Sequence, residues 1–190
     1  MNEQEFPLIN ILIRTSNRPN SFKKLLDSIV AQDYPNIRLI ISYDRHDALR
    51  YIPKGLETVF VTADKTLPFY YDTYINTLKD MVMDGYLWAV DDDEVLMPNV
   101  ISKFPLTGNG FILQLQRQNL IAPKDLNFKI GAAGMPCMIL HHSLKNIANV
   151  SGHGKGDSYW LREVLSKVDL PFVPIIGVYS SGRGLGKCNG

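Results

Sequence analysis

Four consecutive acidic residues, Asp91, Asp92, Asp93 and Glu94, directly follow a short apolar segment at residues 86–90. Like charges at this spacing repel one another, and the chain as a whole has a net charge of only +1. Crowded carboxylate oxygens are the ligands that Mg²⁺ and Mn²⁺ prefer, and these ions usually bind phosphate oxygens as well. The pattern therefore predicts a divalent cation with a phosphate-bearing ligand. The alternative is a solvated turn that caps a helix at "EVLMPNV".

The elements that position this acidic run follow from the hydrophobic pattern of the first half. Apolar runs at 8–14, 37–44, 57–62 and 86–90 predict strands. Between them, apolar residues recur at helical spacing after Asn20, which can cap the first helix. Thr66 with Pro68 begins a second helix that ends near Gly85. Alternating strands and helices predict an α/β fold with a mostly parallel central sheet flanked by helices.

The second half has a mixed pattern. Residues 110–119 alternate apolar and polar side chains, which predicts a half-exposed strand, and 134–142 is a further apolar run. We expect a short helix at 143–150, a longer helix after the glycine-rich loop at 152–158, and an extended segment at 171–180. The absence of a repeat or linker predicts one domain over residues 1–190, with a flexible tail at 181–190.

Composition limits the class of protein. A net charge of +1 provides no global attraction for nucleic acid, so such a partner would need a local basic patch. Cys137 and Cys188 are far apart and predict free thiols in a reducing compartment, with one disulfide as the alternative. The N-terminus lacks the features of a signal peptide, and no apolar run approaches the ~20 residues of a membrane span. We therefore expect a cytoplasmic protein.

Polar residues follow three of the predicted strands. Thr15–Asn17, Asp44 and the acidic run each stand where an apolar segment ends. Because ligands of open parallel sheets bind beyond the carboxyl ends of the strands, these groups should meet at one edge.

Three segments resemble the family 2 glycosyltransferases with the GT-A fold. "INILIRTSNRPNSFKKLLDSIVAQDYPNIRLIISYD" is similar to the opening of that family, and "YLWAVDDDEVLMPN" to its Asp-x-Asp signature. "GKGDSYWLREVL" resembles a later segment in which an acidic residue precedes a helix rich in Trp and Leu. The resemblance covers roughly residues 8–170. The chain is short for the family, and "YDRHDALRY" departs from its usual second acidic motif.

The resemblance implies a nucleotide-diphosphate sugar donor and a Mn²⁺ or Mg²⁺ cofactor. Residues 1–99 would bind the donor, and residues 100–180 would form a small mixed acceptor half. The implied nucleotide contacts are Thr15, Asn17 and Arg18, with Asp44 on the base or ribose. Asp91 and Asp92 would reach the ribose and the water shell of the metal, and Asp93 with Asp91 would form the metal site. The cation would neutralise the diphosphate as the sugar–phosphate bond breaks.

An inverting transfer also needs a base that takes a proton from the acceptor hydroxyl. Asp157 is the candidate, and its alternative role is to cap the helix that follows. His153 is either a contact to the metal, diphosphate or acceptor, or an exposed loop residue. Arg183 and Lys187 form either a lid over the diphosphate or part of a disordered basic tail.

The sequence leaves other functions open. A nucleotidyltransferase usually has a glycine-rich phosphate loop after the first strand, and "RTSNRPNS" contains no glycine. A non-catalytic nucleotide-sugar-binding module is the third possibility. For the acceptor, a saccharide is favoured, although Lys155, Arg183 and Lys187 would allow a nucleic acid. Tyr70, Tyr71 and Tyr74 are expected mainly in the core, with sugar stacking as the lesser alternative.

Overall fold

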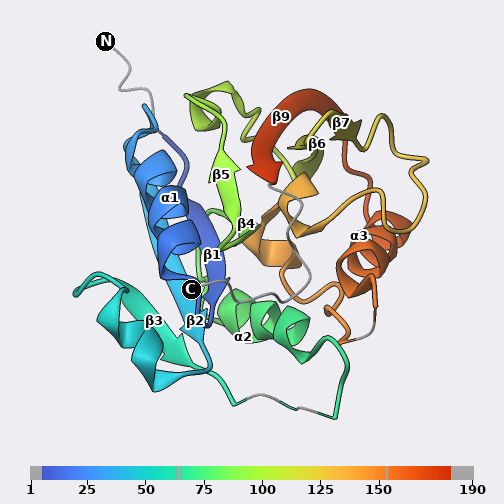
Figure 1. The fold of residues 1–190 in the computed structure, drawn as a ribbon. Coiled ribbons are helices and arrows are strands. Elements are labelled where there is room, and N and C mark those ends of the chain that lie inside the picture. The colour runs from blue at the N-terminus through green and yellow to red at the C-terminus, as the bar shows by residue number, and fades with distance from the viewer. Residues whose placement is uncertain (1–5, 63, 65, 153, 181–190) are drawn as a thin grey trace.

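The computed structural model describes residues 6–62, 64, 66–152 and 154–180 (Figure 1). Its first half alternates strands and helices as expected. The elements are β1 (Ile9–Thr15), α1 (Pro19–Val30), β2 (Ile37–Tyr43), β3 (Glu57–Phe60), α2 (Tyr74–Asp80) and β4 (Tyr86–Asp91). The strands lie in the order β3-β2-β1-β4, and all three of these pairings are parallel. The carboxyl ends of β1, β2 and β4 therefore share one edge.

The second half extends the same sheet with mixed strand directions. Its elements are β5 (Glu94–Leu96), β6 (Gly110–Arg117), β7 (Leu120–Ala122), β8 (Met138–His141), α3 (Gly156–Lys167) and β9 (Phe172–Ser180). The order continues β4-β8-β6-β9-β5, with β7 paired to β6. β8 is antiparallel to both of its neighbours, whereas β6 and β9 are parallel. Although β5 directly follows β4 in the chain, it pairs with β9 at the other end, so the sheet curls.

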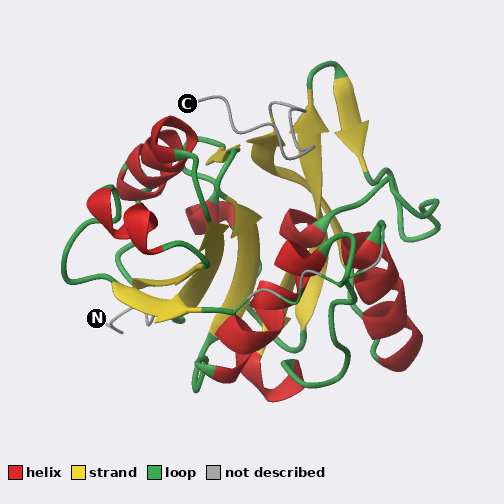
Figure 2. Cartoon of the chain, turned by 60° about the horizontal axis from the view of Figure 1, so that its bottom comes forward, coloured by secondary structure: helices red, strands yellow, loops and turns green. Residues whose placement is uncertain are grey.

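Both faces of the central strands are buried, which explains their nearly continuous apolar sequences. Every residue of β1 except Arg14 is buried, and Trp88 in β4 is fully buried. The Trp88 indole N–H donates a hydrogen bond to the Pro136 carbonyl oxygen at 2.9 Å, so its polar edge is satisfied inside the core. Figure 2 shows helices on both sides of the sheet.

Helix α1 fixes the segment that follows the acidic run. Its Ser28 hydroxyl oxygen accepts a hydrogen bond from the Leu96 amide at 3.0 Å. Just after the helix, the Gln32 side chain accepts from the Val100 amide at 2.9 Å and donates to the Met97 carbonyl oxygen at 3.1 Å. β4 holds one end of the Asp91–Glu94 turn, and α1 with β9 holds the other. The turn therefore has a defined position.

Several local expectations were wrong. The helix predicted at 143–150 is only a 3-10 turn, His142–Leu144. The helix predicted from Thr66 begins at Tyr74, after a 3-10 turn at Tyr70–Thr73. The first helix begins at Pro19 with Arg18 as its N-cap, because proline suits the first helical turn. Residues 94–96 form a strand rather than the alternative helix, since pairing with β9 satisfies their backbone.

The prediction of a half-exposed strand at 110–119 was also wrong. β6 is buried over most of its length because it lies between β8 and β9. Its polar side chains Gln114 and Gln116 are partly covered and donate hydrogen bonds to nearby carbonyl oxygens. Alternation in the sequence therefore indicates the polarity of the two faces of a strand, but not how far other parts of the chain bury them.

Candidate functional site

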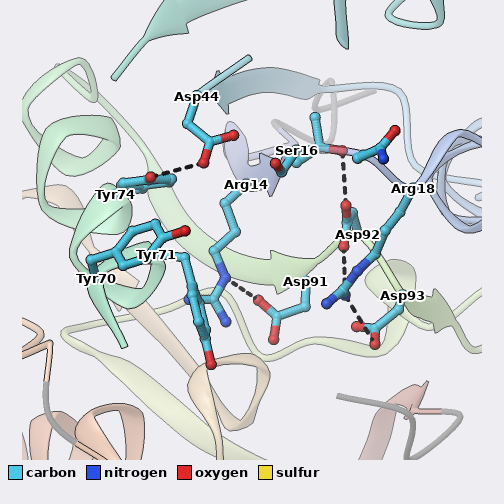
Figure 3. A pocket seen from close by; sticks show the side chains of 12 residues that line it. Arg14, Ser16, Arg18, Asp44, Tyr70, Tyr71, Tyr74, Asp91, Asp92 and Asp93 are labelled. Atoms are coloured by element: carbon cyan, nitrogen blue, oxygen red, sulfur yellow. Dashed lines mark hydrogen bonds and ion pairs between the residues drawn. The ribbon is translucent and has the colours of Figure 1, made fainter. Parts of the chain in front are cut away.

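A cavity of about 210 Å³ lies where β1, β2 and β4 end (Figure 3). It collects residues from four separate parts of the chain, three of which the sequence predicted to meet. They are Arg14, Thr15, Ser16, Asn17, Arg18, Asp44, Tyr70, Tyr71, Tyr74, Asp91, Asp92 and Asp93. We call this space the first cavity. The expected convergence of Thr15, Asn17, Arg18, Asp44 and the aspartates is therefore present in the structure.

Asp92 is the most enclosed aspartate of the run. It is 5% exposed, and its two carboxylate oxygens accept hydrogen bonds from the Thr15 hydroxyl at 2.8 Å and Arg18 at 3.0 Å. Burial raises the pKa of Asp92 to about 6, against the opposing effect of Arg18. Because its oxygens bind protein groups, Asp92 acts here as an anchor for Thr15 and Arg18.

Arg18 also reaches the next aspartate. A guanidinium nitrogen of Arg18 lies 3.2 Å from a carboxylate oxygen of Asp93. Burial raises the pKa of Asp93, and neighbouring Asp91 adds to this effect while Arg18 opposes it. In Figure 3 the dashed contacts join Arg18 to both Asp92 and Asp93. One arginine thus compensates part of the charge of two aspartates.

Arg14 compensates the charge of Asp91. The sequence analysis did not predict Arg14 as a site residue. Its Nε donates to Asp91 Oδ1 at 2.7 Å, and its Nη1 forms an ion pair with Asp72. The guanidinium carbon also lies 5.0 Å from the centre of the Tyr71 ring. Burial opposes the charged form, but Asp91 and Asp72 outweigh it and hold the pKa of Arg14 above its ordinary value. The sequence signal for this role was a charged residue near the end of an otherwise apolar strand.

Glu94 lies beneath the acidic turn. It is 3% exposed, and its Oε2 accepts a hydrogen bond from the Asp91 amide at 2.9 Å. Burial, followed by the charge of Asp91, raises its pKa well above the ordinary value. A shift in this direction favours the neutral form, which lowers the repulsion within the run. Glu94 therefore shapes the turn from inside.

A second cavity, of about 250 Å³, adjoins the first. Arg14, Tyr71, Asp91 and Asp93 line both cavities, so a ligand can extend from one into the other past the acidic turn. The second cavity is also lined by Asp157, which does not line the first.

Asp157 lies in the first turn of α3 but is not its N-cap, since Lys155 occupies that position with a φ of 64°. Asp157 Oδ1 accepts a hydrogen bond from the Ser158 amide at 2.7 Å. Burial raises the pKa of Asp157 to about 6. A Cβ atom at Gly134 would stand 3.1 Å from Asp157 Oδ2, so a glycine at this position leaves the carboxylate room.

Asp44 also lines the first cavity. Its Oδ2 accepts a hydrogen bond from the Tyr74 hydroxyl at 3.1 Å. Its Oδ1 is buried and receives no hydrogen bond from the part of the chain that the structure describes. Tyr70 and Tyr71 are only half buried and line the cavity, so the core expectation for the tyrosines holds for Tyr74 alone.

Three of the predicted site residues cannot be placed. His153, Arg183 and Lys187 lie outside the described residues.

Among the residues described, no group of three or more His, Cys, Asp or Glu side chains is arranged to hold a metal ion. The chemistry of the donor set nevertheless fits Mg²⁺ or Mn²⁺, because Asp91 and Asp93 present carboxylate oxygens to both cavities. Within the described part of the chain, no helix is long and apolar enough to cross a membrane.

The fold is that of the GT-A glycosyltransferases. A crystal structure of S. aureus TarS superposes with a TM-score of 0.73 at 12% identity, over 91% of this chain and 36% of that chain. Its 1–349 fragment in complex with UDP-GlcNAc gives 0.67 at 14% identity, over 91% of this chain and 58% of the fragment.

The mannosyltransferase PcManGT from Pyrobaculum calidifontis, in complex with GDP-Man and Mn²⁺, gives a TM-score of 0.65 at 14% identity. That match covers 95% of this chain and 59% of PcManGT. The chain therefore spans between about a third and three fifths of these solved structures. No protein-family model matches the sequence, and no curated protein does. The expected GT-A fold is confirmed by structure alone.

The Arg14 network yields a test by stability. Replacing Arg14 with Leu leaves Asp72 and Asp91 without their cation. We expect a loss of roughly 2–4 kcal/mol in the free energy of unfolding, less than for a fully buried pair because Asp91 is partly exposed. Adding Asp72→Asn should recover part of that loss, since it removes one uncompensated charge. Urea denaturation of the three proteins measures both effects.

The matched control is Lys23→Leu, because Lys23 pairs with Asp27 on the exposed face of α1. It should change the free energy of unfolding by less than about 1 kcal/mol. If Arg14→Leu costs no more than this control, the network does not stabilise the site.

Proposed function

We propose that the protein is a glycosyltransferase that moves a sugar from a nucleotide-diphosphate donor to an acceptor hydroxyl. The observation that carries the proposal is the pair of adjoining cavities: Asp44 lines only the first, Asp157 lines only the second, and Asp91 and Asp93 line both. A nucleotide in the first cavity would place its diphosphate beside these two aspartates and its sugar near Asp157. The GT-A fold supports this assignment, as do the UDP, UDP-GlcNAc and GDP-Man complexes of its structural neighbours.

Thr15, Asn17 and Arg18 would contact the nucleotide, and Asp44 its base or ribose. Asp92 would act mainly by holding Thr15 and Arg18, because both of its oxygens already accept hydrogen bonds from them. We assign His153 and the tail residues Arg183 and Lys187 to the substrate side on the family resemblance alone. A saccharide remains the proposed acceptor, with residues 100–180 as the acceptor half.

The proposed reaction depends on Mn²⁺ or Mg²⁺. Asp93, with Asp91, would hold the cation, which when bound neutralises charge on the departing diphosphate. Asp72, Asp91, Asp92, Asp93 and Glu94 gather around Arg14 and Arg18. The carboxylates outnumber the guanidinium groups, so the region keeps an uncompensated negative charge that attracts a cation. The Mn²⁺ in the PcManGT complex agrees with this proposal.

Calorimetric titration tests the metal site directly. Mn²⁺ should bind in the presence of UDP or GDP, and Asp93→Asn should weaken this binding at least about tenfold. The control is Asp27→Asn, because Asp27 is an exposed carboxylate on α1, and it should leave Mn²⁺ affinity unchanged. Tight nucleotide binding that is indifferent to Mn²⁺ in the wild type would rule the metal proposal out.

Asp157 would act as the general base and so give inversion at the sugar. With Asp157 raised to a pKa of about 6, the carboxylate form needed to accept a proton predominates above that pH. We expect kcat/KM to rise with pH through about 6 and then level off.

Asp157→Asn cannot accept the proton and should lower kcat by about 10²–10⁴-fold. It should leave nucleotide affinity nearly unchanged, because Asp157 does not line the first cavity. Release of nucleoside diphosphate in the presence of saccharide acceptors measures turnover, and calorimetry measures binding. Asp169→Asn is the control, as this residue is exposed just beyond α3. Near-normal turnover in the Asp157→Asn protein would remove it from the mechanism.

A further inference from the structure

The second cavity is lined by two cations, Arg117 and Lys155, that take no part in the proposed reaction. We propose that the acceptor is an anionic saccharide, whose phosphate or carboxylate group binds these two side chains while one of its hydroxyls meets Asp157. This inference rests on the proposed function and names the chemical class of the acceptor at the same site.

The register of the sheet directs Arg117 toward the second cavity. Arg117 is the last residue of β6, and this end of β6 lies between β7 and β9 (Figure 1). It stands opposite Leu120 on one side and Ser180 on the other, and residues opposite one another share a face of the sheet. All three line the cavity. Neither neighbour is charged, and no described carboxylate forms an ion pair with Arg117, so its exposed side chain is available to a ligand.

Lys155 reaches the same cavity from the loop before α3. Its φ of 64° is left-handed, a conformation that glycine adopts freely and that a residue with a Cβ atom adopts at a cost. The side chain lies along the backbone of Gly131, where a Cβ atom would stand 3.4 Å from Lys155 Cδ and Cε and 3.8 Å from Nζ. The Gly131 amide in turn donates to the Ser158 hydroxyl oxygen of α3 at 2.9 Å. A lysine strained in this way, with its ammonium group at a cavity wall, indicates a use for the side chain there.

The carboxylates of the second cavity do not cancel these two cations. Four of the five that line it belong to the acidic turn and the Arg14 network: Asp72, Asp91, Asp93 and Glu94. The fifth, Asp157, forms no ion pair with any described residue, and neither does Lys155. Two cations therefore stand against one such carboxylate, and this excess of positive charge attracts an anion.

The remaining lining favours a sugar that carries the anion. The planar guanidinium group of arginine binds phosphate or carboxylate through two parallel hydrogen bonds, and the ammonium group of lysine adds a point charge. Phe69 and Tyr71 line the same cavity, and their aromatic faces suit the apolar faces of a sugar ring. A neutral saccharide would leave both cations without a partner.

The test compares small probes by NMR titration of the wild-type chain saturated with Mn²⁺ and with UDP or GDP, so that the diphosphate site is filled. Glucose 6-phosphate or glucuronic acid should bind at least about tenfold more tightly than glucose, as one hydrogen bond between charged groups provides. The tighter of the two identifies the anion. Glucose that binds as well as both would overturn the proposal.

Two further probes test the saccharide. Inorganic phosphate should bind more weakly than glucose 6-phosphate, because it makes no contact with the aromatic wall. Equal affinity would reduce the site to an anion site and contradict an anionic saccharide. A short oligothymidylate that binds more tightly than either charged sugar would contradict it in favour of a nucleic acid.

Variants assign the effect to the two cations. Arg117→Gln and Lys155→Gly should each weaken binding of the charged sugar by about tenfold and leave glucose binding unchanged. Glycine adopts the backbone conformation of Lys155 without strain, so Lys155→Gly should keep or raise the free energy of unfolding. Lys124→Gln is the matched control, because Lys124 is an exposed lysine that does not line the cavity. Unchanged affinity for the charged sugar in both variants would contradict the proposal.

The outcomes also separate this inference from the function on which it rests. Folded wild-type protein that binds neither UDP nor GDP contradicts the transferase proposal and the acceptor class with it. Nucleotide binding without a preference for charged sugars contradicts only the anionic acceptor and leaves the transferase proposal standing.

Discussion

The site depends on two arginines that compensate a buried acidic turn. Arg14 pairs with Asp91 and Asp72, and Arg18 pairs with Asp92 and Asp93. Without these cations, carboxylates this enclosed would either take up protons or force the turn toward solvent. With them, negative charge stays concentrated at the end of a core strand. The compensation is incomplete, which leaves a region suited to a further cation.

The fold determines where that charge stands. Parallel pairing of β1 with β2 and β4 brings Arg14, Asp44 and Asp91 to one edge of the sheet. The curl of the sheet through β8, β6 and β9 then returns the chain, so that β9 pairs with β5 just after the acidic turn. Asp157, at the start of α3, joins the site across the second cavity. Residues more than 60 positions apart thereby line one continuous space.

Much of this arrangement could be predicted from the sequence. Apolar runs ending in polar residues are a local signal, and they correctly placed Thr15, Asp44 and the aspartates together. The sequence did not show which side chains pair with one another. Arg14 is one charge in an apolar strand, and nothing local shows that Asp72, 58 residues later, lies beside it.

The errors have the same origin. The helix predicted at 143–150 failed because tertiary contacts hold this segment: the carbonyl oxygens of Ala148 and Val150 accept hydrogen bonds from Lys79 and Asn76 of α2. The structure also changes the sequence-based explanation of the acidic run, which relied on a divalent cation alone. The acidic run does not need a metal to relieve all of its repulsion, since arginines supply part of the compensation.

The central claim is that the acidic turn binds a divalent cation together with the donor diphosphate. Anomalous diffraction from crystals grown with UDP and Mn²⁺ tests it most directly. We expect a manganese peak that adjoins Asp93 and the diphosphate, at the junction of the two cavities. UDP bound in the first cavity with no such peak, and with Arg18 still paired to Asp93, would contradict it.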